Sequence, residues 1–441
     1  MLRTDGTARN HTGGPNCGIR LFFEQSDCPL SLLRLLNFTG SGWAVSGEPL
    51  SKEMRAKPAV QATLGTRVAL LLIGFGSYLN LNAVQPLLPL FRLQFHASEI
   101  QVSLTVSASA LAVALTAPLA GVVADRWGRK RIIVAAMLGI AVATALSATA
   151  VTLPQLIAWR FLQGIFVPGA AAVVLAYVSE EAPPAAVGRT MATYITGTIL
   201  GGFAGRFLNG LIAPLWGWRA AFLLLGAATF ASGVGTGWRL PPSTRFVPRR
   251  TGEGTFGALG KHLRNRQLLT AYLVGAFLLL SQVSTFTYVN FYLADPPFRL
   301  GPTALSEIFV VYLLGAAVTP TAGRLADLLG RRTALLGAVG VSAVGMLLTL
   351  LPVLAAVVLG LTLLAAGVFA CQAAAQSQVG TVAGDARSSA AGLYISLFYI
   401  GGTLGSVIPG LFWSVVGWPG CVAFVLAVQL LTAAIVYLNW E

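Results

Sequence analysis

Long apolar stretches separated by short polar segments dominate the chain from about residue 68 to its end. A helix needs about 20 apolar residues to cross the hydrocarbon core of a bilayer. Stretches of this length predict an all-α membrane protein with twelve transmembrane helices. The predicted helices cover residues 68–90, 101–123, 131–151, 154–177, 190–213, 219–239, 268–291, 304–326, 333–352, 354–377, 389–413 and 420–438.

The composition indicates lipid rather than water around most of the chain. Of its 441 residues, 56% are hydrophobic and 10% are charged, whereas soluble domains have about 45–50% and about 25%. The net charge of +14 lies in short clusters between apolar stretches, so no nucleic-acid partner is expected. Cys17, Cys28, Cys371 and Cys421 show no metal or redox spacing, and we expect no metal and no cofactor.

Basic residues are distributed unevenly between the two sides of these predicted helices. If the N-terminus is cytoplasmic, nearly all of the 29 Lys and Arg residues fall in cytoplasmic segments. The outer loops then hold only Arg92, Arg219 and Arg299. Cytoplasmic loops of membrane proteins carry this excess of positive charge. The pattern predicts a multi-pass protein of the plasma membrane, in bacteria the inner membrane, with both termini in the cytoplasm.

Two motifs recur in the second half of the chain. GVVADRWGRK at residues 121–130 returns as GRLADLLGRR at residues 323–332, and TYITGTILGG at residues 193–202 returns as LYISLFYIGG at residues 393–402. Two recurrences at nearly the same offset indicate two six-helix bundles in parallel repeat. The expected organisation is a bundle over 67–240, a basic cytoplasmic linker over 241–267 and a second bundle over 268–441.

Residues 1–66 differ from the rest of the chain, because they are polar and contain no stretch long enough to span a membrane. They also lack the basic start, apolar core and cleavage site of a signal peptide. We expect a disordered N-terminal extension. Met54 precedes a basic lead-in to the first helix and is a candidate for the true start of translation.

The twelve helices, the parallel halves and the G-x-x-x-D-R-x-G-R-K loop after the second helix resemble the major facilitator superfamily. This loop is the signature of that superfamily, and WRFLQGIF in the fourth helix resembles a second signature. QPLLPL, AYVSEEAPP, GGFAGR and GLYISLFYIGGTLGS resemble the YnfM-type, arabinose-efflux-like inner-membrane transport proteins, a branch related to drug–proton antiporters. The resemblance implies a major facilitator fold and a secondary transporter that works by alternating access.

The resemblance also implies a gating role for the repeated loop, in which Asp125 pairs across to the other half and holds the outward-facing state. The alternative is a solvated cytoplasmic loop, whose basic residues reflect only the excess of positive charge on the cytoplasmic side of membrane proteins. The expected gating motif consists of Gly121, Asp125, Arg126, Gly128, Arg129 and Lys130, with Gly323, Asp327, Gly330 and Arg331 in the repeat.

Two arginines lie well inside predicted helices, Arg160 in the fourth and Arg206 in the fifth. A charge at membrane depth is costly unless partners or water relieve it, so a functional role is the first hypothesis. The alternative is that both side chains snorkel toward the membrane surface or bond to carbonyls of neighbouring helices. No acid occupies the centre of a predicted helix, and the fifth helix lacks the Gly-Pro pair of the antiporter signature. Both features disfavour a proton-coupled exporter of cationic drugs and favour a neutral polar or anionic substrate.

Uncharged polar residues on the first, fourth, seventh and tenth helices complete the candidate substrate path, since the resemblance implies that these helices line it. Amides and a phenol can orient a ligand without a fixed charge, although they can also bond between helices. The candidates are Asn80, Asn82, Gln85, Gln163, Gln282, Tyr288, Asn290, Gln372 and Gln376. A separate set of glycines is expected to allow close helix packing: Gly197, Gly201, Gly202, Gly205, Gly401, Gly402 and Gly405.

These features predict a secondary active transporter that exports a small drug-like, sugar-like or anionic solute, with protons as the candidate coupling ion. Uptake or facilitative transport of a neutral or anionic metabolite remains the alternative. The chain has no Walker motif for direct ATP drive. A membrane enzyme is not expected, because no histidine lies in a predicted helix, and the linker is too short for the extra domain of a sensor. The expected partners are the lipid bilayer and the small solute, and we expect a monomer.

Overall fold

The computed structural model describes residues 63–183, 186–243, 264–382 and 387–440. Most of the predicted N-terminal extension, including Met54, and most of the predicted linker lie outside these residues. Helix α1 already begins at Leu64, a few residues before the first predicted span.

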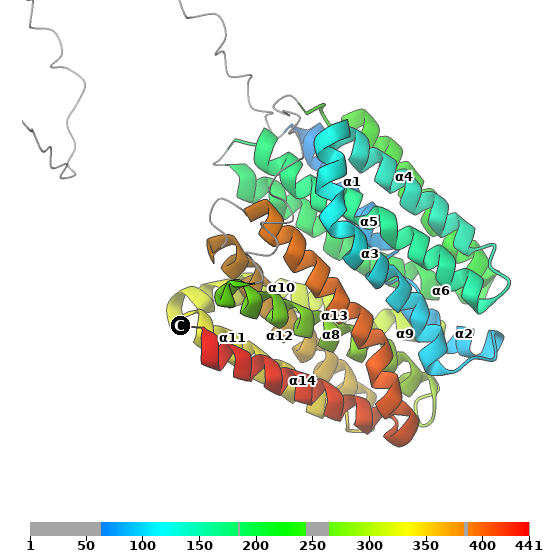
Figure 1. The fold of residues 1–441 in the computed structure, drawn as a ribbon. Helices are drawn as coiled ribbons and strands as arrows, with labels where there is room; N and C mark the ends of the chain where they lie inside the picture. The colour runs from blue at the N-terminus through cyan, green and yellow to red at the C-terminus, as the bar shows by residue number, and fades with distance from the viewer. Residues whose placement is uncertain (1–62, 184–185, 244–263, 383–386, 441) are drawn as a thin grey trace, which may run out of the picture. The chain divides into compact units, whose positions relative to one another are not determined.

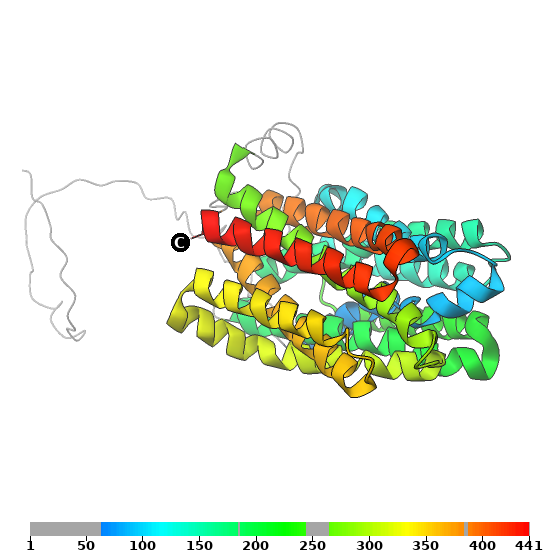
Figure 2. The same cartoon turned by 90° about the horizontal axis from the view of Figure 1, so that it is seen from below.

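Every regular element in the described residues is a helix. In chain order these are α1 (Leu64–Leu79), η1 (Gln85–Leu87), α2 (Leu88–Gln94), α3 (Glu99–Trp127), α4 (Arg129–Ser147), α5 (Leu153–Glu181), α6 (Val187–Arg239), α8 (Arg266–Ala294), α9 (Pro302–Ile308), α10 (Val311–Leu329), α11 (Arg331–Leu348), α12 (Leu354–Val382), α13 (Arg387–Val416) and α14 (Trp418–Asn439). The long helices run along one another in both views of the protein (Figures 1 and 2).

Nine helices of the described residues are long and apolar enough to cross a membrane. One of them, α6, contains the fifth and sixth predicted spans, joined at a kink at Gly217. The first predicted span corresponds to α1, η1 and α2, and the eighth to α9 and α10. Each predicted span therefore consists mainly of helix, and the all-α fold class is confirmed.

The first span is interrupted, although the sequence pattern predicts one continuous helix over residues 68–90. Helix α1 ends at Leu79, turns follow, and η1 and α2 then continue the span. Pro86 and Pro89 lie at the starts of η1 and α2. Proline has no N–H group, which the first turn of a helix tolerates but the interior of a continuous helix does not. The break leaves carbonyls at the end of α1 without their usual helical donors.

The sequence repeat is also a repeat of backbone conformation. Gly128 turns the chain from α3 to α4 with φ of 90°, and Gly330 turns it from α10 to α11 with φ of 82°. Gly217 and Gly417 are 200 residues apart, like the two copies of the second repeated motif, and have φ of 83° and 70°. Positive φ is a conformation that glycine adopts without steric cost, so the turn geometry accounts for the glycine at all four positions.

Small residues bring helices into close contact inside each half. Helix α6 packs along α1, and α13 packs along α8. A Cβ atom would collide with main-chain atoms of the facing helix at Gly197, Gly201, Gly205, Gly401 and Gly405. Gly202 and Gly402 instead face side chains, those of Arg206 and Leu279.

Helices of the two halves also pack against each other. Helix α3 of the first half lies along α13 of the second (Figure 1), and α6 contacts α9. In the second half, α14 (red) lies beside α13 (orange) in Figure 2. We call the end of the molecule at which α3 and α10 end the motif end, and the other the opposite end.

Candidate functional site

Arg160 is fully buried in α5, about two turns after the start of the helix. Its Nε donates to the carbonyl of Thr105 at 3.3 Å, and its terminal nitrogens donate to the carbonyls of Asn80, at 2.9 Å, and of Leu81. One terminal nitrogen also donates to Oε1 of Gln163. Two of the three carbonyls belong to the break after α1, so the guanidinium supplies the donors that the interrupted helix lacks.

Two predicted path residues extend this Arg160 cluster within the first half. Gln163 donates from Nε2 to the hydroxyl of Thr144 in α4 at 2.8 Å. Asn80 donates from Nδ2 to the hydroxyl of Thr229 in α6 at 2.6 Å. These bonds join helices of one half through Arg160, Gln163 and Asn80. They match the alternative in which buried arginines and amides bond to neighbouring helices. A part for them in transport stays a prediction.

Arg206 lies in a different setting, at the contact between the two halves. Its side chain in α6 is buried, with 4% of the residue exposed. Nε donates to Oε1 of Gln85 at 2.8 Å, and a terminal nitrogen donates to the carbonyl of Gly202 at 2.7 Å. The guanidinium carbon is 4.5 Å from the ring centre of Tyr312 and 5.0 Å from that of Phe309. These are cation–π distances, and both rings belong to the second half.

The partners of Arg206 reach further into the second half. Gln85 donates from Nε2 to the hydroxyl of Thr287 in α8 at 3.4 Å, and the side chain of Gln282 in α8 lies close to that of Tyr312. We call this set the Arg206 cage: Arg206, Gln85, Gln282, Thr287, Phe309 and Tyr312. The sequence indicated the first three, but it gave no signal for the hydroxyl and the two rings, because threonine and aromatic residues are common in apolar helices.

The remaining predicted path residues lie outside both clusters. Tyr288 donates to the carbonyl of Ser406 at 3.1 Å, and Asn290 donates from Nδ2 to the carbonyl of Phe286 at 2.6 Å. Both side chains are buried. Three further candidates are less buried: Asn82 and Gln372 are partly exposed, and Gln376 is exposed.

A charged cluster joins the two halves at the opposite end. Arg92 in α2 donates to both carboxylate oxygens of Asp295, at 2.7 and 3.2 Å, and to Oε1 of Glu99 at 2.9 Å. Asp295 follows α8 in the second half, whereas the other two residues belong to the first. The hydrogen bond with Asp295 raises the pKa of Arg92 further above its already high value. The sequence placed these charges near one face of the membrane but did not pair them.

At the motif end, the described ion pairs stay within the first half. Arg129 lies 2.8 Å from a carboxylate oxygen of Asp125. Arg129 also donates to both carboxylate oxygens of Glu180 in α5, at 2.7 and 3.2 Å. These contacts hold the ends of α3, α4 and α5 together. The described partner of Asp125 is thus Arg129 of its own half. The pairing of Asp125 with the other half, which the resemblance implied for the outward-facing state, stays a prediction.

The second copy of the gating motif is described only in part. Arg331 donates to Oε1 of Gln378 in α12 at 2.9 Å. The side chain of Asp327, like Gly323, lies in a segment of α10 outside the described side chains. Arg126 is exposed, and Lys130 is partly buried.

Acids whose side chains the structure describes lie near helix ends or just beyond them. They are Glu99, Asp125, Glu180, Glu181, Asp295 and Glu307. None of them contributes a carboxylate to the described contacts of Arg160 or Arg206. The described partners of Arg160 and Arg206 are therefore neutral acceptors or rings.

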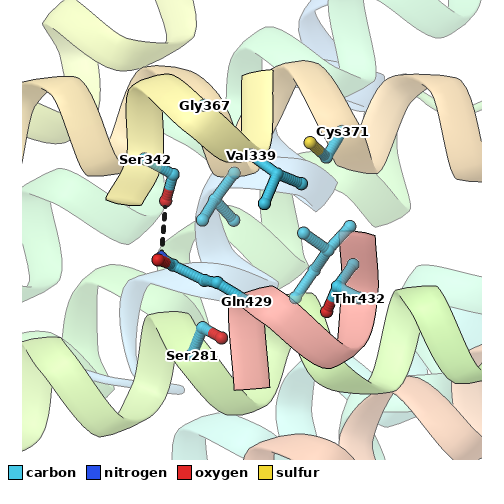
Figure 3. A pocket seen from close by; sticks show the side chains of 9 residues that line it. Ser281, Val339, Ser342, Gly367, Cys371, Gln429 and Thr432 are labelled. Carbon is cyan, nitrogen blue, oxygen red and sulfur yellow. Dashed lines mark hydrogen bonds between the residues drawn. The ribbon is translucent and has the colours of Figure 1, made fainter. Parts of the chain in front are cut away.

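A small cavity of about 10 Å³ lies inside the second half, between α8, α11, α12 and α14 (Figure 3). Gln429 donates from Nε2 to the hydroxyl of Ser342 across it at 2.8 Å. Its volume is about that needed for one water molecule. Because it is enclosed within one half, it is not a candidate for a substrate path between the halves.

Known proteins resemble the chain over most of its length. The family model described as Major Facilitator Superfamily matches residues 70–296 and 294–440. The uncharacterized MFS-type transporter YybF of Bacillus subtilis (strain 168) is 33% identical over 353 residues, which are 80% of this chain and 87% of that protein. The inner membrane transport protein YnfM of Escherichia coli (strain K12) is 31% identical over 370 residues, 84% of this chain and 88% of that protein.

A solved structure has the same fold. The crystal structure of a bacterial homolog of the human lysosomal transporter Spinster, in an inward-facing and unoccupied conformation, matches with a TM-score of 0.71 at 17% identity. The match covers 85% of this chain and 96% of that chain. The solved fold agrees with the predicted fold class, an all-α membrane protein with the major facilitator fold. The chain belongs to the Major Facilitator Superfamily, a family of membrane transporters.

Proposed function

We propose that the protein is a secondary active transporter of the cell inner membrane that exports a small neutral polar or anionic solute by alternating access. The motif end, with both chain termini, faces the cytoplasm in this proposal, as the distribution of Lys and Arg supports. Protons are the proposed coupling ion. Catalysis of a chemical reaction is not part of the proposal.

The Arg206 cage is the observation that carries the proposed substrate class. The described partners of this buried cation are an amide oxygen, a carbonyl and two aromatic rings. A cation at this depth without a described carboxylate partner favours a ligand that is anionic or rich in hydrogen-bond acceptors, and it disfavours a cationic one.

The position of the cage supports a link between binding and conformational change. Arg206 comes from the first half, whereas Phe309, Tyr312 and Thr287 come from the second. A solute that takes the place of Gln85 or of a ring at the guanidinium alters contacts between the halves. A ligand can shift a conformational equilibrium only through such a difference in contacts between the two states.

The ion pairs support a conformation closed at the opposite end. There, Arg92 and Asp295 connect the two halves, while at the motif end Asp125 pairs with Arg129 of its own half. Closure at the opposite end and access from the motif end are the properties of an inward-facing state. The outward direction of net transport rests on the resemblance of the closing segment, GLYISLFYIGGTLGS, to efflux-like transport proteins.

Flux into vesicles tests the proposed function. The full chain is reconstituted into lipid vesicles, and a panel of neutral, anionic and permanently cationic solutes is followed with and without an imposed pH gradient. We expect a neutral or anionic solute to accumulate in vesicles whose proteins expose the motif end outward, and to leak back when the gradient is collapsed. Protein-free vesicles are the control.

Each departure from this result removes a defined part of the proposal. Equilibration that ignores the gradient rejects proton coupling and favours facilitative transport. Accumulation only in vesicles of the reverse orientation rejects export and favours uptake. Movement of cationic solutes alone rejects the substrate class inferred from the cage.

The charged cluster at the opposite end predicts the effect of a charge exchange. Arg92→Asp places a third carboxylate beside Asp295 and Glu99, so closure of this end is opposed by repulsion. We expect the initial rate of flux to fall about tenfold, equivalent to about 1.4 kcal/mol. Adding Asp295→Arg restores an ion pair of reversed polarity and is expected to recover most of the rate.

A matched variant separates this effect from a general change of charge. Arg299 is exposed at the same end, and Arg299→Asp changes the net charge equally. Its flux should stay close to that of the wild type. A double variant as slow as Arg92→Asp alone would show that the ion pair does not contribute to closure.

A further inference from the structure

A groove of about 450 Å³ lies at the motif end of the first half, where α3 ends and α4 begins. It is lined by Arg126, Trp127, Arg131, Ile132 and Ala135. The two arginines and the tryptophan are exposed, the tryptophan by 67%. Two guanidinium groups, an indole and two apolar side chains therefore share one concave surface.

One residue of the gating motif, Arg126, lines this groove, but the described ion pairs of the motif lie outside it. The described ion pairs of the motif use Asp125 and Arg129, which do not line it. In the second half the motif keeps its aspartate, glycine and arginine, but the groove positions lose their arginines and their tryptophan. The residues equivalent to the groove are Leu328, Leu329, Thr333, Ala334 and Gly337. The chemistry of the groove is thus a property of the first half alone.

An exposed apolar stripe leads along α3 to the groove. Its members are spaced by four or seven residues, a spacing that places side chains on one face of a helix. On a membrane-spanning helix, an exposed apolar face of this length contacts lipid acyl chains. The stripe consists of Leu104, Leu111, Leu115, Leu119 and Val123, which are 36%, 38%, 58%, 53% and 41% exposed, and ends at Trp127 in the groove.

We propose that the groove binds the phosphate headgroup of an anionic phospholipid in the leaflet at the motif end, with the acyl chains of that lipid along the stripe of α3. Guanidinium groups bind phosphate oxygens through paired, charge-assisted hydrogen bonds. Tryptophan is enriched at the headgroup level of membranes, and basic pockets beside transmembrane helices suit anionic headgroups.

The apolar part of the site distinguishes a lipid from a soluble phosphate compound. Ile132 and Ala135 line the groove itself, and the stripe continues from Trp127 along α3. A small water-soluble anion has nothing to contact on these surfaces, whereas the acyl chains of a phospholipid cover them. The site lies beside Asp125 and Arg129, so a bound headgroup is positioned to restrain the gating loop.

Native mass spectrometry of the purified full chain tests the site. The protein is titrated with phosphatidylglycerol and, separately, with phosphatidylcholine of the same acyl chains. The double variant Arg126→Gln/Arg131→Gln is expected to bind the first phosphatidylglycerol about tenfold more weakly, while its weaker binding of phosphatidylcholine stays unchanged. Arg189→Gln removes an exposed arginine near the start of α6, at the same end, and should bind like the wild type.

A second measurement uses the unaltered groove. Brominated phosphatidylglycerol quenches tryptophan fluorescence at short range, and the difference between the wild type and Trp127→Phe isolates Trp127. We expect this difference to be quenched more strongly by brominated phosphatidylglycerol than by brominated phosphatidylcholine. Thermal unfolding of each variant at the wild-type temperature shows that the fold is intact.

Several results would overturn the proposal. Equal phosphatidylglycerol binding by the wild type and the double variant would show that the two arginines do not bind the headgroup. An equal loss of phosphatidylglycerol binding in Arg189→Gln would show that the loss in the double variant comes from the change of net charge. Equal quenching of Trp127 by both brominated lipids rejects headgroup selection, and displacement of the lipid by an equal concentration of glycerol 3-phosphate identifies a soluble anion as the ligand.

Discussion

Replacing Arg206 with glutamine is expected to lower solute flux about a hundredfold while leaving membrane insertion and thermal unfolding close to wild type. The variant removes the positive charge between Gln85 and the rings of Phe309 and Tyr312. A hundredfold loss equals about 2.7 kcal/mol, within the range for a hydrogen bond to a charged group. The fold tolerates the change, because the main-chain acceptor of the guanidinium, the carbonyl of Gly202, lies one turn away in the same helix.

Initial rates of flux in reconstituted vesicles measure this effect. Arg206→Lys is the matched control, since it keeps the charge but loses the planar guanidinium. We expect it to retain part of the flux. Normal flux in Arg206→Gln would exclude the charge from the transport path and would withdraw the proposed preference for anionic or acceptor-rich solutes.

Replacing Arg160 with methionine is expected to have the second large effect, on stability. Methionine fills similar space but donates no hydrogen bond, so the carbonyls of Asn80, Leu81 and Thr105 lose their bonds to the side chain. Hydrogen bonds between membrane helices contribute about 1–2 kcal/mol each in model peptides, and three such bonds about 3–6 kcal/mol. We expect a lower unfolding temperature and a lower yield of folded protein.

Thermal unfolding of the purified protein measures the second effect, and the two buried arginines serve as controls for each other. Arg160→Lys keeps an ammonium group that can donate to some of the carbonyls, so an intermediate unfolding temperature is expected. An Arg160→Met protein as stable as the wild type would mean that the break after α1 needs no donor. Equal destabilisation by Arg160→Met and Arg206→Gln would remove the distinction between the two sites.

The sequence predicted most helices within a few residues, because the length of an apolar stretch is a local property set by the bilayer. The last predicted span, residues 420–438, corresponds to α14 at Trp418–Asn439. The first and eighth spans are the exceptions, since each is divided into separate helices. In the first span the apolar pattern continues through the turns after Leu79. Pro86 and Pro89 signal that interruption, but hydropathy alone does not register it.

The candidate site was predicted less completely. Arg160 and Arg206 looked equivalent in the sequence, since both are charges inside apolar helices. The structure separates them: one is bonded to carbonyls within a single half, and the other stacks on rings from the second half. The sequence could not make this distinction, because it does not specify how far each helix is rotated about its own axis.

The membrane class, the parallel duplication and the turns at Gly128 and Gly330 follow from the amino-acid sequence alone. These depend on hydrophobic length and backbone conformation, which short segments specify locally. Which polar groups contact one another depends on the packing of the helices in space. Arg206 and Gln85 are 121 residues apart, and Arg92 and Asp295 are 203 apart. Hydrogen bonds and ion pairs require atoms within about 3 Å, and that proximity results from how the helices of both halves pack.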